Sequence, residues 1–163
     1  MPSNPILRLK KTMSERTEHA NPKRSTSISI IAIINGIGLL ITILFWGTVY
    51  FKNLVPLPGN LTDMAERANA ATTYGFMIGD IIWSAPLLLL AAVGLWRQRF
   101  WGWTAAQMVN ILWVYSMTIV WIRDSYSIIS PGAMIFLPFT LAAVWATYHL
   151  WNHRKPFLAS EQY

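Results

Sequence analysis

Long runs of apolar residues alternate with short polar segments along this chain. Residues 28–51 carry no charged side chain, and at about 1.5 Å per residue a helix of that length exceeds the roughly 30 Å of a bilayer's hydrocarbon core. Three further apolar runs, at residues 73–96, 103–122 and 132–151, are joined by polar connections. The pattern predicts an all-α integral membrane protein, a four-helix transmembrane bundle with up-and-down topology.

The two ends of the chain are polar and flank this transmembrane domain, which we place at residues 27–153. Residues 1–26 are rich in Lys and Arg and contain early prolines, which predicts a disordered basic cytoplasmic tail. In an alternative interpretation, the apolar and basic side chains mixed at residues 6–11 lie on anionic lipid. Residues 154–163 are predicted to form a second cytoplasmic tail.

The basic residues also predict the orientation of the chain. Lys and Arg concentrate in the N-terminal tail, in the turn at residues 97–99 and after the fourth span, whereas the opposite side carries only Lys52, Arg67 and Arg123. Because basic loops are retained in the cytoplasm, both termini are predicted to be cytoplasmic (N-in/C-in), in a bacterial plasma membrane. Aromatic residues such as Trp46 lie near predicted span ends, as interfacial belts require.

Composition supports the membrane class and excludes several kinds of chemistry. Hydrophobic residues make up 54% of the chain and charged residues 12%, about half the charge of a soluble domain. With no cysteine, disulfides, thiol catalysis and cysteine-ligated metals are excluded. The net charge of +6 sits mostly at the ends of apolar runs, so the predicted partner is the lipid bilayer and no nucleic acid.

Asp80 is the acidic residue inside a predicted span. It lies about 10 Å from the outer end of its helix, where an ionised carboxylate costs on the order of 2–3 kcal/mol and should face the bundle interior. Polar residues at a similar depth stand on the other three spans, and we predict that they form one outer polar layer with Asp80: Thr42, Tyr115, Ser116 and Thr140.

Pro86 makes this layer a candidate intramembrane polar site. Proline has no backbone N–H to bond the carbonyl of Ile82, so a free carbonyl is expected close to Asp80. A carboxylate beside a free carbonyl is suited to a proton or a cation. The alternative is that Asp80 is wetted near the outer surface, or hydrogen-bonds only to fix helix packing.

Small and amide side chains predict where the helices pack. Gly75 and Gly79 form a G-x-x-x-G spacing, which allows two helices to approach closely. Asn35 and Asn110 lie at similar depths on the first and third spans and are expected to hydrogen-bond across them. His149 and His153 have metal-ligand spacing on one helix face, but no acid or cysteine stands near them, so no metal site is predicted.

Three functions are compatible with these residues. The first is a non-enzymatic membrane component that packs through its small-residue faces against itself, as a homo-oligomer, or against a membrane-protein partner. The second is a small carrier or channel with a proton or cation site at Asp80. The third, an enzyme acting on a lipidic substrate, is disfavoured because Asp80 lacks a second positioned acid, base or nucleophile. No catalytic residue and no cofactor are therefore predicted.

Overall fold

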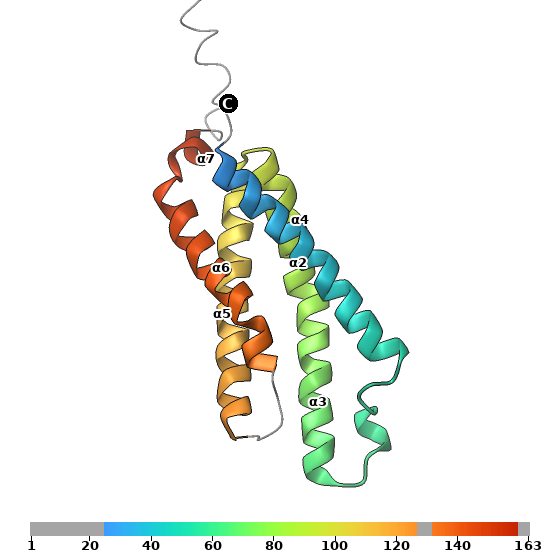
Figure 1. Ribbon diagram of the computed structural model, residues 1–163. Helices are drawn as coiled ribbons and strands as arrows, with labels where there is room; N and C mark the ends of the chain where they lie inside the picture. Colours follow the sequence, from blue (N-terminus) through green and yellow to red (C-terminus); the bar gives the residue numbers. More distant parts are fainter. Residues whose placement is uncertain (1–24, 127–131, 160–163) are drawn as a thin grey trace, which may run out of the picture.

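A computed structural model describes residues 25–126 and 132–159 of the chain (Figure 1), and these residues form helices connected by short loops. The predicted tail at residues 1–26 therefore falls almost entirely outside the described residues. In chain order the elements are α2 (Thr26–Phe51), the 3-10 helix η1 (Pro58–Asn60), α3 (Met64–Gly79), the π-helical segment η2 (Asp80–Ser84), α4 (Ala85–Trp96), α5 (Phe100–Tyr126), α6 (Gly132–Asn152) and α7 (Lys155–Ala159).

Among the described residues, three helices are long and apolar enough to cross a membrane, namely Thr26–Phe51, Met64–Trp96 and Phe100–Arg123. They contain the first three predicted spans. The prediction of an all-helical chain is confirmed for the described residues, and these three helices suggest a membrane protein. The second helix begins at Met64 rather than near residue 73. The carboxylate of Asp63 explains this early start, because it accepts hydrogen bonds from the backbone N–H groups of Ala65 and Glu66, both at 2.9 Å, and so caps the helix.

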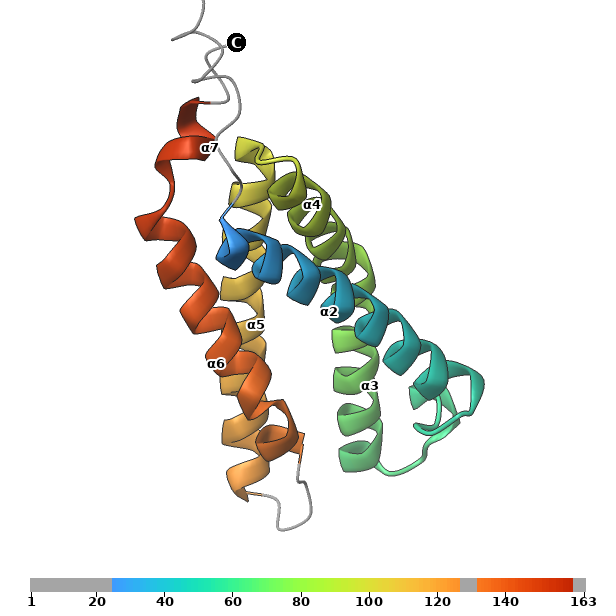
Figure 2. The same ribbon diagram turned by 45° about the horizontal axis from the view of Figure 1, so that its top comes forward.

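The helices are closely packed at one end and splayed at the other. α4 packs against both α2 and α5, and α6 packs against α5. By contrast, α3 has η1 and η2 as its main neighbours, and it stands apart from α5 and α6 in both views (Figures 1 and 2). The hydrophobic core gathers where α2, α4, α5, α6 and α7 meet: Ile28, Ile31, Ala32, Ala91, Leu95, Ala105, Ala106, Val109, Ala146, Leu150 and Phe157.

A tight hairpin joins α4 to α5 and brings two glycines together. Gln98 adopts a φ of 52°, and the N–H of Arg99 donates to the carbonyl of Gly94 at 2.8 Å, as in a Schellman helix terminus. Beyond this turn, Gly94 and Gly102 approach so closely that a Cβ on either would overlap the backbone of the other. This glycine pair is the close helix contact of the fold, and the sequence patterns considered above did not identify it.

The chain does not leave the bundle as a simple tail after the fourth long helix. Residues Lys155–Ala159 form α7, and the side chain of Phe157 is fully buried. Two hydrogen bonds also hold α6 to α5: Trp103 Nε1 donates to the carbonyl of Leu150 at 2.9 Å, and Gln107 Nε2 donates to the carbonyl of Thr147 at 3.3 Å. The C-terminal segment is therefore part of the packed end of the bundle.

Candidate functional site

The second membrane helix changes its winding at the acidic residue. α3 continues into η2, in which the N–H of Ala85 bonds the carbonyl of Asp80, five residues back. Pro86 follows directly and has no N–H to offer. The chain thus accommodates the proline with a wider π turn, a feature that occurs frequently at functional sites.

Both carboxylate oxygens of Asp80 have a protein donor. Trp46 Nε1 on α2 donates to Oδ2 at 2.8 Å, and the Ser84 hydroxyl, one turn further along the same helix, donates to Oδ1 at 2.9 Å. The indole of Trp46 is 8% exposed, and the bond to Asp80 is partly buried. We call Asp80, Trp46 and Ser84 the carboxylate clamp, because it ties α2 to η2.

Sequence reasoning missed both donors of the carboxylate clamp. Trp46 was interpreted as an interfacial residue, and Ser84 was not considered. The signal was available, since Trp46 lies one helical turn beyond Thr42 on the same face of the first span, and Ser84 is four residues after Asp80. A buried indole N–H usually finds an acceptor, and the Asp80 carboxylate supplies one to Trp46.

The structure does not gather the predicted outer polar layer around Asp80. Tyr115 is 63% exposed on α5, and Ser116 is half-buried. The buried Thr140 hydroxyl donates to the carbonyl of Phe136 in its own helix at 3.1 Å. Thr42 lies instead against a pocket between α2 and α6.

The residues predicted to pack helices divide into two pairs with different surroundings. An added Cβ at Gly75 or Gly79 would meet nothing within 4 Å, so neither glycine has a close partner among the described residues. Asn35 and Asn110 are both buried, but Asn35 Nδ2 donates to the carbonyl of Ile31 at 2.8 Å within α2. The side-chain Nδ2 of Asn110 has no hydrogen-bond partner in the part of the chain that the structure describes.

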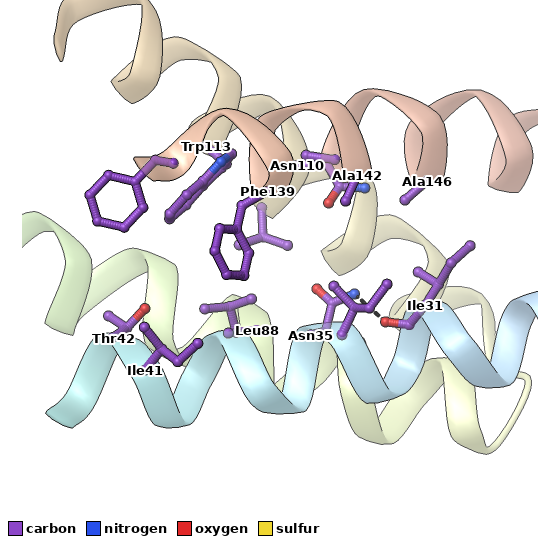
Figure 3. A pocket seen from close by; sticks show the side chains of 15 residues that line it. Ile31, Asn35, Ile41, Thr42, Leu88, Asn110, Trp113, Phe139, Ala142 and Ala146 are labelled. Carbon is purple, nitrogen blue, oxygen red and sulfur yellow. Dashed lines mark hydrogen bonds between the residues drawn. The ribbon is translucent and has the colours of Figure 1, made fainter. Parts of the chain in front are cut away.

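The two asparagines line a pocket that separates α2 from α6 (Figure 3). Its cavity volume is about 80 Å³. In the close view their carboxamides lie on facing walls and point toward one another. The other walls are almost entirely apolar: Ile31, Ile34, Gly38, Ile41, Thr42, Leu88, Val109, Trp113, Phe136, Phe139, Ala142, Ala143 and Ala146.

The histidine pair on α6 forms a stack rather than an open ligand set. The rings of His149 and His153 lie 4.1 Å apart between centroids, and His153 Nδ1 is 2.9 Å from the carbonyl oxygen of His149. Within residues 25–126 and 132–159, no group of three or more His, Cys, Asp or Glu side chains is placed to hold a metal ion.

These features define a class: the described residues form an all-helical protein with three helices long and apolar enough to cross a membrane. Its buried and half-buried polar side chains form the carboxylate clamp and part of the pocket wall. Comparison of the chain with protein-family models, curated proteins and solved structures finds no match.

Proposed function

We propose that the chain forms a four-helix transmembrane bundle in a bacterial plasma membrane, with α6 as the fourth span and both termini in the cytoplasm. Two features support this arrangement. α6 is 21 residues long and packs along α5. The turn after α4, which contains Arg97 and Arg99, lies at the same end of the molecule as α7 (Figure 1). α7 begins at Lys155, directly after Arg154 in the chain, and basic residues favour the cytoplasmic side.

We propose further that the protein is a non-enzymatic membrane component that packs against a second copy of itself through α3. The splayed end of the bundle is the observation that carries this proposal. α3 has few neighbours within the chain, only Ala70 among its residues is buried, and Gly75 with Gly79 presents a small-residue face with open space before it. Such a face lets another helix approach closely enough for backbone contact.

Substitution of Gly79 tests this function. Gly79→Leu places a branched side chain on the open face of α3, and we expect it to weaken self-association about tenfold because the two helices can no longer approach closely. The measurement is energy transfer between labelled copies in bilayers over a range of protein-to-lipid ratios.

Gly47→Leu on α2 is the matched control, since an added Cβ there also meets nothing within 4 Å, and it should associate like the unmodified protein. A chain that stays monomeric at every ratio would contradict the proposal. Equal association of the Gly79→Leu and unmodified chains would contradict it as well.

A carrier or channel with a proton or cation site at Asp80 is the second candidate function. The favouring observation is the coincidence of a half-buried carboxylate with a π turn inside an apolar helix. In proteoliposomes, Asp80→Asn should then abolish any pH-driven or cation flux, because the amide cannot exchange a proton or carry charge, while leaving oligomer size unchanged. Normal flux in this variant would reject the carrier.

A further inference from the structure

The pocket between α2 and α6 contains a hydrogen-bond acceptor, Asn35 Oδ1, that has no donor among the described residues. Within this part of the chain, the one hydrogen bond of the Asn35 side chain runs from Nδ2 to the carbonyl of Ile31, in the same helix. Its Oδ1 is therefore left on the pocket side of α2, as the close view shows (Figure 3). Because Asn35 is only 4% exposed, this oxygen has little access to water outside the pocket.

The facing wall of the pocket contains a hydrogen-bond donor without a partner among the described residues, the side-chain Nδ2 of Asn110. Asn110 on α5 is 7% exposed, and its Nδ2 has no hydrogen-bond partner among the described residues. A buried amide without a partner is costly, so such groups in folded proteins call for a ligand, water or ion. Rotation of the carboxamide turns this N–H toward the pocket without moving α5.

The remaining walls favour an apolar occupant. They are formed by aliphatic and aromatic side chains, with Leu88 of α4 and Phe139 of α6 on opposite sides. α2 packs against α4, and α6 packs against α5. Over the described residues, α2 and α6 do not pack closely against each other, and the pocket lies between them. Since both helices present exposed apolar side chains to the surroundings, a molecule dissolved in the bilayer can reach this gap from the side.

We propose that this pocket binds the polar end of a membrane-soluble alcohol, with Asn35 Oδ1 accepting from the ligand hydroxyl and Asn110 Nδ2 donating to it. A hydroxyl group is one donor and an acceptor on a single atom, which matches Asn35 Oδ1 and Asn110 Nδ2 once the Asn110 carboxamide has rotated its N–H toward the pocket. A ketone or ester would satisfy Asn110 alone, and a hydrocarbon would satisfy neither. The cavity of about 80 Å³ holds the hydroxyl end of such a molecule, and the rest of its chain extends between α2 and α6.

This site is separate from the α3 face on which the proposed self-association rests. The pocket lining contains no residue of α3 or η2. Loss of self-association in Gly79→Leu would therefore leave alcohol binding intact, and loss of alcohol binding would leave the oligomer intact.

Photolabelling of the full chain in nanodiscs tests the proposal. The probe is hexadecanol with a diazirine near its hydroxyl end, and the reference probe is hexadecane with the diazirine on the corresponding carbon. We expect the alcohol to label the pocket-lining segments about tenfold more than the hydrocarbon does, with unlabelled hexadecanol competing. Equal labelling by both probes, or labelling confined to other segments, would overturn the proposal.

Three variants make the test specific. Asn110→Leu should abolish the preference for the alcohol, and it should also raise the thermal stability of the protein, because it replaces an unpartnered buried amide with an apolar side chain. Ala142→Leu should reduce labelling by filling the pocket without changing either amide. Asn69→Leu, at an exposed asparagine on α3, should label normally. A preserved tenfold preference in folded Asn110→Leu would refute the assignment.

Discussion

Gly102→Ala is expected to lower the free energy of unfolding by about 3 kcal/mol or more. The added Cβ would overlap the backbone of Gly94, so α4 and α5 would have to move apart along the hairpin. Overpacking in a close-packed interior typically costs about 1–3 kcal/mol and more where backbone must shift. The measurement is SDS-induced unfolding in mixed micelles, followed by circular dichroism and tryptophan fluorescence.

Gly75→Ala is the matched control for this prediction. The same methyl group is added to a helical glycine, but nothing lies within 4 Å of it. Its effect should be neutral, or stabilising by up to about 1 kcal/mol, because alanine favours the helix. A similar loss of stability in both variants would show that the loss in Gly102→Ala does not come from the Gly94–Gly102 contact.

Trp46→Phe is expected to destabilise the protein by about 1.5–3 kcal/mol. The phenyl ring preserves most of the packing of the indole but removes the N–H that donates to Asp80 Oδ2. A hydrogen bond to a charged group is worth more than one between neutral groups, and its loss leaves a partly buried carboxylate oxygen without this donor. The same unfolding assay measures the change.

A double-mutant cycle then assigns the loss to the carboxylate clamp. With Trp46→Phe, Asp80→Leu and the double variant, the coupling energy should exceed about 0.5 kcal/mol, as for residues in direct contact. Trp83→Phe is the control, since Trp83 is 66% exposed and its ring can be replaced with little change. Additive effects of Trp46→Phe and Asp80→Leu would mean that the two side chains stabilise the fold independently.

The positions of the first three long apolar helices could be predicted because each is a run of apolar residues between polar connections. The run at 28–51 corresponds to Thr26–Phe51. The full length of the second helix could not be predicted in this way, since it begins at Met64 in a polar segment. Predicting the positions of apolar runs needs no knowledge of how one helix lies against another.

The partners of Asp80 could not be predicted from depth alone. Thr42 and Trp46 share a face of α2, but only the tilt of α2 relative to η2 decides which of them reaches the carboxylate. A π turn also has no simple sequence signature. The depth of a residue along its helix indicates which side chains lie at the same level. Which of them touch also depends on how each helix is rotated about its axis and tilted against its neighbour.

The Gly94–Gly102 contact, by contrast, could have been found. The two glycines are each four residues from Gln98, at the centre of the hairpin turn. Residues equidistant from such a turn meet across antiparallel helices, and small residues there permit a close approach. G-x-x-x-G spacing favours Gly75 and Gly79 instead, although in the described part of the chain nothing lies within 4 Å of a Cβ added at either.

The π turn at Asp80–Ser84 has an angular consequence for the whole second membrane helix. Each residue of an α-helix advances the chain by about 100° around its axis, so one residue accommodated in a wider turn offsets the faces on either side of it. α4 can then direct Gly94 toward α5 while Asp80 points toward α2. The inner and outer halves of one continuous helix are thereby related by a fixed angular offset, and α3 presents its glycines in a different direction from the one they would have if the helix were α-helical throughout.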